Sequence, residues 1–80
     1  MVKKKRRVQL MKTDFEPLTK RELEVLKLVI FGFSNPEIAN KLNISYSTAK
    51  AHCKSIFEKL NAKNRVEAAT IAIKNGIVWI

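Results

Sequence analysis

Apolar residues recur every three or four positions from residue 18 onward, and no stretch alternates apolar and polar residues over the length of a strand. This spacing places apolar side chains on one face of a helix. Only two glycines and two prolines interrupt the whole chain. The pattern therefore predicts an all-α domain.

Capping signals predict where the first helix begins and ends. Thr19 precedes Glu22 by three positions, an arrangement in which each side chain bonds the other residue's backbone amide. A helix is expected from Lys20 to about Phe31, and Gly32 can end it in a left-handed conformation. The apolar side of this helix contains Leu23, Leu26, Val29 and Ile30.

A second, shorter helix is expected from about Pro36 to Leu42. Asn35 followed by Pro36 marks its start, because proline suits the first helical position, where the missing amide has no partner to lose. Asn43 can stop this helix, and Ser45 can cap the next one. The break between the two helices is about three residues long.

The third helix, from Tyr46 to about Leu60, has the clearest two-sided pattern in the chain. One side contains Ala49, His52, Cys53, Ile56 and Leu60. The opposite side contains Ser47, Lys50, Ala51, Lys54 and Glu58. The first side is expected to face the core and the second side to face solvent.

A fourth helix is expected from about Arg65 to Lys74. Asn64 and Glu67 repeat the capping-box spacing at its start, and Asn75 and Gly76 close it. Apolar residues lie on more than one of its faces, so part of its surface needs a further partner. The residues proposed for a two-fold dimer contact are Val66, Thr70 and Ile73. The alternative is that residues 77–80 fold back over this stripe.

Length and charge divide the chain into a tail and a body. Eighty residues with 46% hydrophobic content suffice for one small domain, residues 18–80. The net charge is +9, of which +6 comes from the six basic residues among positions 1–12. Such a basic chain is attracted to polyanions. Residues 1–17 are predicted to be a flexible basic arm that adds non-specific phosphate affinity or solubility.

Several classes of site are excluded by residue usage. A single cysteine, Cys53, cannot form a disulfide within the chain or supply a structural zinc site, and it fits a reducing compartment. His52 has no partner for general-base chemistry, and neither paired carboxylates nor a glycine-rich phosphate loop is present. No apolar run reaches the length of a membrane span. We therefore expect neither an enzyme nor a membrane protein, and no metal or cofactor.

A short helix, a three-residue turn and a longer two-sided helix predict a helix-turn-helix over about residues 35–54. Lys50 and Lys54 on the outward side could contact guanine N7 and O6 or phosphate, while small side chains beside them permit close approach. Tyr46 and Ser47 lie at the helix start, where backbone amides favour a phosphate. Taken alone, lysines four apart are also typical of a solvated helix face.

Four segments together resemble the LuxR/GerE-type helix-turn-helix domain of bacterial transcription factors. They are "LTKRELEVLKLV", "GFSNPEIANKLNIS", "STAKAHCKSIFEKLNAKNRVEAA" and "NGIV". The resemblance runs from Leu18 through Val78, and its specificity comes from the order and spacing of the segments.

The resemblance implies a four-helix domain whose third helix reads the major groove and whose fourth helix forms a dimer contact. It implies base contacts by Lys50, Ala51 and Lys54, and it places Ser47 and Thr48 near phosphates. Packing and helix geometry are the implied roles of Glu22, Glu37, Ile38, Ala39 and Ile56. Three positions depart from the family's pattern: Pro36 replaces a common lysine and so removes a possible phosphate contact, Ala49 replaces a usual valine, and Ser55 replaces a frequent asparagine.

The sequence therefore predicts a regulator of transcription that binds double-stranded DNA as a homodimer on an inverted repeat in the bacterial cytoplasm, at the nucleoid. RNA polymerase is a candidate partner, and no small-molecule substrate is expected. The chain would be either a stand-alone regulator or the effector domain of a longer one. Two alternatives stay open: region 4 of a sigma factor, against which residues 59–78 argue, and an adaptor that uses the same fold to bind proteins.

Overall fold

Four capped helices form the part of the chain that the computed structural model describes, residues 17–77. The helices are α2 (Lys20–Ile30), α3 (Asn35–Leu42), α4 (Tyr46–Leu60) and α5 (Arg65–Lys74). The described residues contain no strand, so the all-α prediction is confirmed. The predicted arm lies outside this part except for Pro17, and so do residues 78–80 of the apolar C-terminal tip.

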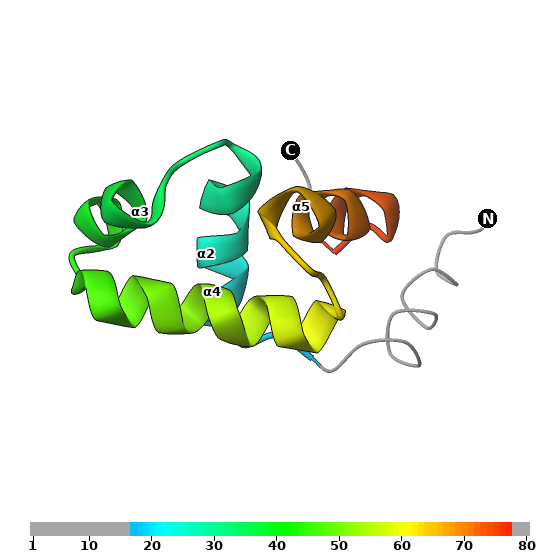
Figure 1. Ribbon diagram of the computed structural model, residues 1–80, viewed down its shortest axis with the longest axis horizontal. Helices are drawn as coiled ribbons and strands as arrows, with labels where there is room; N and C mark the ends of the chain where they lie inside the picture. Colours follow the sequence, from blue (N-terminus) through cyan, green and yellow to red (C-terminus); the bar gives the residue numbers. More distant parts are fainter. Residues whose placement is uncertain (1–16, 78–80) are drawn as a thin grey trace.

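Helix α4 lies across the bundle and contacts the other three helices (Figure 1). Helices α3 and α5 lie at opposite ends of α4, and α2 lies between them. The largest fully buried side chains come from three helices: Val25 and Leu26 of α2, Ile38 of α3, and Ile56 and Leu60 of α4. Helix α5 adds two fully buried alanines, Ala68 and Ala72, which allow it to approach the bundle closely. A single core therefore holds α4 against all its neighbours.

The ends of α2 agree with the capping prediction. The Thr19 amide donates to a Glu22 carboxylate oxygen over 2.9 Å, and the Glu22 amide donates to the Thr19 hydroxyl over 3.0 Å. The helix stops at Ile30, one residue before the predicted end, and Phe31 caps it. Gly32 follows with a φ of +94°, in the left-handed region expected of it.

Two predicted caps were wrong in detail. Helix α3 is capped by Ser34, so that Asn35 becomes the first helical residue. Ser34 lies three positions before Glu37 and exchanges hydrogen bonds of 3.3 and 2.8 Å with it, which Asn35 cannot do at its spacing. At α5, Asn64 accepts from the Glu67 amide as expected. The Glu67 carboxylate instead accepts from the Lys63 amide, over 2.6 Å, and so the capping box is only half formed.

The turn between α3 and α4 is short and tightly bonded. Asn43 takes the left-handed conformation predicted for it, with a φ of 57° and a ψ of 47°. The Ile44 amide then donates to the Ala39 carbonyl over 2.9 Å, and the Ser45 hydroxyl accepts from the Thr48 amide over 3.0 Å. These bonds fix the direction in which α4 leaves the turn.

A buried ion pair joins α2 to the end of α4. The Lys59 ammonium donates to one Glu22 oxygen over 2.9 Å, and the Ser55 hydroxyl donates to the other over 2.7 Å. Burial raises the pKa of this carboxyl, but its three hydrogen bonds and the positive charge of Lys59 outweigh burial and bring the pKa down to about 2. Ser55 thus bonds the Glu22 oxygen that Lys59 does not use.

Candidate nucleic-acid interface

The outward side of α4 is the candidate interface, and the structure divides the helix as the sequence predicts. Ala49, Cys53, Ile56 and Leu60 are buried. Ser47, Lys50, Ala51, Lys54 and Glu58 are exposed. The one difference is His52, which is only half-buried and lies at the margin between the two sides. The exposed side offers two long cationic side chains beside two small ones.

The start of α4 leaves backbone donors open. Ser45 uses its hydroxyl to cap the Thr48 amide and also donates to the Thr48 hydroxyl over 2.8 Å. Within residues 17–77, the amides of Tyr46 and Ser47 have no acceptor. Both side chains are exposed, that of Tyr46 by 51% of its surface. A phosphate could therefore approach this helix end, where the helix dipole favours negative charge.

Both outward lysines make only weak contacts within the chain. The Lys50 ammonium lies 5.9 Å from the centroid of the Tyr46 ring. The Lys54 ammonium lies 3.8 Å from a Glu58 oxygen, and these side chains are 78% and 68% exposed. Exposed ion pairs of this kind contribute little to stability. Both lysines can therefore exchange their present contacts for a DNA phosphate or a base edge.

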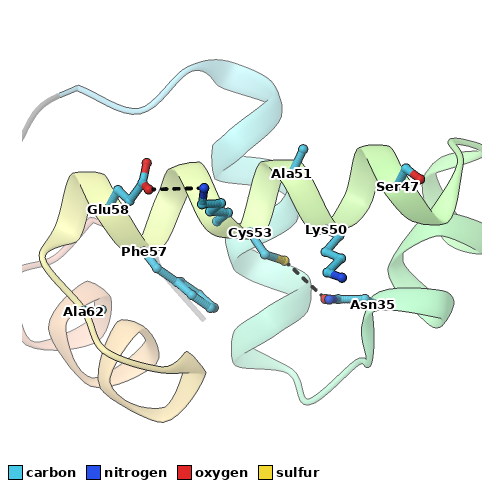
Figure 2. Close-up of a pocket in the computed structure, with 9 residues that line it drawn as sticks. Asn35, Ser47, Lys50, Ala51, Cys53, Phe57, Glu58 and Ala62 are labelled. Carbon is cyan, nitrogen blue, oxygen red and sulfur yellow. Dashed lines mark hydrogen bonds and ion pairs between the residues drawn. The ribbon is translucent and has the colours of Figure 1, made fainter.

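An open hollow of about 580 Å³ runs along the flank of α4 (Figure 2). The predicted outward residues of α4, which are Ser47, Lys50, Ala51, Lys54 and Glu58, all line it, so they are brought together at one surface. The other lining residues are Asn35, Cys53, Phe57 and Ala62. Asn35 belongs to α3 and Ala62 to the loop after α4, so spacing within α4 could not identify these two.

A polar cluster at this hollow joins three helices. Arg65, the first residue of α5, donates to the Asn35 side-chain oxygen over 2.8 Å and to the Phe33 carbonyl over 3.4 Å. The Cys53 thiol donates to the same Asn35 oxygen over 3.3 Å. Cys53 is thus buried, as predicted, but it acts as a hydrogen-bond donor as well as a small apolar side chain.

The three residues predicted for a dimer contact lie on the exposed surface of α5. Val66 is 73% exposed and Ile73 is 50% exposed. The Thr70 hydroxyl donates to the Val66 carbonyl over 3.0 Å, so its hydrogen bond is made within its own helix. The Ile77 amide donates to the Ala72 carbonyl, and the Ile77 side chain packs against the core. Residues 78–80, which were the alternative cover for the Val66, Thr70 and Ile73 stripe, lie outside the described residues.

The part of the chain that the structure describes contains neither a cluster of metal ligands nor a membrane-spanning helix. Residues 17–77 contain no group of three or more His, Cys, Asp or Glu side chains able to hold a metal ion. None of the helices described is both long enough and apolar enough to cross a membrane.

Comparison with known proteins agrees with this architecture. Residues 16–72 match the bacterial regulatory proteins of the luxR family. The match includes residues 59–72, most of the segment that distinguishes this family from region 4 of a sigma factor. As the sequence predicts, this is a family of regulators of transcription and not of enzymes.

Individual relatives are regulators longer than this chain. The uncharacterized transcriptional regulatory protein YxjL of Bacillus subtilis is 52% identical over 63 residues, 79% of this chain and 29% of YxjL. The response regulator protein VraR of Staphylococcus aureus is 35% identical over 78 residues, 98% of this chain and 37% of VraR.

A solved structure supports the same assignment. The response regulator ChrA of a heme-sensing two-component system superposes with a TM-score of 0.76 at 36% identity, over 86% of this chain and 36% of ChrA. The chain thus spans between 29% and 37% of the length of these three relatives. It belongs to the luxR family of bacterial regulatory proteins and forms that family's helix-turn-helix DNA-binding domain.

Proposed function

We propose that this domain reads a specific double-stranded DNA sequence by placing α4 in the major groove. The observation that carries the proposal is the exposed face of α4, on which two weakly bonded lysines lie beside Ser47 and Ala51. The capped turn before α4 fixes the direction of this helix. The width of the major groove admits one α-helix, and lysine can donate to guanine N7 and O6 there. Lys50 and Lys54 would contact bases, and the Ala51 methyl group would contact a base directly or allow close approach.

The start of α4 would hold the phosphate backbone. Tyr46, Ser47 and Thr48 lie there, where two amides remain open and the dipole is favourable. Contacts of this kind position a helix in the groove without reading sequence. The domain would act in the bacterial cytoplasm at the nucleoid, with RNA polymerase as a candidate partner.

Methylation interference tests the groove assignment. Methylation of guanine N7 blocks the major groove, and methylation of adenine N3 blocks the minor groove. We expect guanine methylation within the bound site to reduce binding strongly and adenine methylation there to have little effect. Interference by adenine methylation alone would place the protein in the minor groove and contradict the proposal.

A homodimer on an inverted repeat is the second part of the proposal. Val66 and Ile73 are apolar and exposed on α5, and with Thr70 they form a stripe at positions i, i+4 and i+7. Two copies that pair through this stripe would be related by a two-fold axis, as the two halves of an inverted repeat are.

Val66→Glu should separate the two copies, because it places like charges opposite each other across the two-fold axis. In sedimentation at tens of micromolar with a palindromic duplex, the wild type should bind as two copies and the variant as one. Glu67→Gln, beside it, is the control for a change in charge, because its side-chain oxygen can still accept from the Lys63 amide. A wild type that binds one copy per palindrome would contradict the dimer.

The basic arm should strengthen binding to any duplex. Residues 3–7 are five consecutive basic residues, and each phosphate that they neutralise adds about 0.9 to the slope of log K against log salt. Replacing all five with glutamine should lower that slope by up to about 4.5 and weaken selected and random duplexes by similar factors. A loss confined to the selected duplex would instead assign base reading to the arm.

A further inference from the structure

The side-chain amide of Asn35 has a fixed orientation. Its oxygen accepts from Arg65 over 2.8 Å and from the Cys53 thiol over 3.3 Å. Arginine can only donate hydrogen bonds, so the atom facing Arg65 must be the amide oxygen and not the nitrogen. The orientation of the carboxamide is therefore determined by chemistry, and its two N–H donors point away from Arg65.

The oxygen of the Asn35 side chain accepts two hydrogen bonds, from Arg65 and from Cys53. The amino group of the same side chain has no acceptor among residues 17–77. Asn35 lines the hollow on the flank of α4, where the Lys50 side chain points towards it (Figure 2). Because Asn35 belongs to α3, an oriented neutral donor from α3 and the cationic groups of α4 line the same hollow.

A helix in the major groove has one phosphate backbone on each side. Because the hollow follows the flank of α4, the backbone on that side would run along it when α4 occupies the groove. Phe57 and Ala62 also line the hollow and offer an apolar surface for the deoxyribose. The Asn35 donor matches a phosphate oxygen, while Lys50 and Lys54, which also line the hollow, would extend to the base edges.

We propose that Asn35 is a DNA-backbone-contacting residue whose amino group donates to a phosphate oxygen, with Arg65 and Cys53 holding the amide in the orientation that this contact needs. The inference rests on the proposed function and adds a contact from α3 to those of α4.

A matched pair of variants tests the contact. Asn35→Asp keeps an oxygen for Arg65 but replaces the amino group with a negatively charged oxygen. Asn40→Asp makes the same chemical change at an exposed position on the same helix. On both selected and random duplex, Asn35→Asp should bind about tenfold more weakly than Asn40→Asp, because a charge-assisted hydrogen bond is lost and a repulsion is added. Equal losses for the two variants would overturn the proposal.

A second measurement locates the contact and is independent of any effect on folding. Single phosphates of the duplex are replaced in turn by neutral methylphosphonates, and each substitution is combined with Asn35→Asp. One phosphate should weaken wild-type binding when neutralised but have little effect on the variant, a coupling of about tenfold. If the two changes act independently at every phosphate, Asn35 makes no such contact.

The outcome separates this inference from the proposed function. A wild-type domain that prefers the selected duplex but shows no coupling at Asn35 overturns only the backbone contact. A wild-type domain that binds all duplexes alike overturns the proposed base reading, whatever Asn35 does.

Discussion

Lys50→Ala will weaken binding to the selected duplex by about 1 to 3 kcal/mol, and it will weaken binding to random duplex much less. The reason is the position of Lys50 in the middle of the exposed side of α4, where its ammonium lies 5.9 Å from the centroid of the Tyr46 ring and has no hydrogen bond or ion pair among residues 17–77. A lysine there can reach a guanine, and alanine leaves that base edge without a donor. Specificity should therefore fall with affinity, at the base pair that Lys50 reads.

Lys27→Ala is the matched control for this experiment. Lys27 is an exposed lysine on α2 and does not line the hollow beside α4. Lys27→Ala removes the same charge as Lys50→Ala, so it should lower the affinity slightly and by the same factor for both duplexes. Fluorescence anisotropy at a fixed salt concentration gives both affinities. If Lys50→Ala also lowers the affinity for both duplexes by the same factor, Lys50 contacts a phosphate and does not read a base.

Glu22→Gln will lower the free energy of unfolding by about 3 kcal/mol at neutral pH. A carboxyl whose pKa falls from 4.5 in the unfolded chain to about 2 in the folded one contributes about that much to stability. The variant also leaves the Lys59 ammonium, which is largely buried, without its counter-charge. The substitution should therefore act on the whole fold, although Glu22 lies on a different helix from the reading face.

The pH dependence of stability gives this prediction a distinctive form. Because the pKa of Glu22 is lower in the folded state, its contribution is fully present above pH 4.5 and is lost as the pH falls from 4.5 towards 2. The difference in free energy of unfolding between wild type and Glu22→Gln should therefore become smaller as the pH falls from 4.5 towards 2.

Glu24→Gln serves as the control for Glu22→Gln. Glu24 pairs with Arg21 on the exposed surface of α2, so its removal should cost at most about 0.5 kcal/mol. Denaturant unfolding at pH 7 and pH 3 measures both variants against wild type. If the loss of unfolding free energy in Glu22→Gln is small at pH 7, or is the same at both pH values, the role of the Glu22–Lys59 pair is contradicted.

Local signals were sufficient to predict the four helices and the outward side of α4. The two-sided pattern of α4 depends only on helical spacing within 15 residues, and the bounds predicted for this helix, Tyr46 to Leu60, agree with the structure. The cap of α3 shows where such signals compete. Ser34 and Asn35 are both good capping residues, and the distance to Glu37 decides in favour of the serine.

Contacts between distant segments were not predictable in the same way. Asn35 and Arg65 are 30 residues apart, and Glu22 and Lys59 are 37 residues apart. Their meeting depends on how α2, α3 and α5 pack against α4, which no spacing rule states. The candidate site was therefore predicted on α4 and missed on α3, where Asn35 faces the same hollow.

Selection of binding sites from random duplex DNA, at near-physiological salt, is the decisive test of base reading by α4, because it presupposes neither a target nor a contact. We expect an enriched inverted repeat whose half-sites are centred about one helical turn apart and contain guanines within reach of Lys50 and Lys54. Recovery of no preferred sequence, with equal binding to every duplex, would contradict base reading by α4 and favour a domain that binds proteins through the same fold.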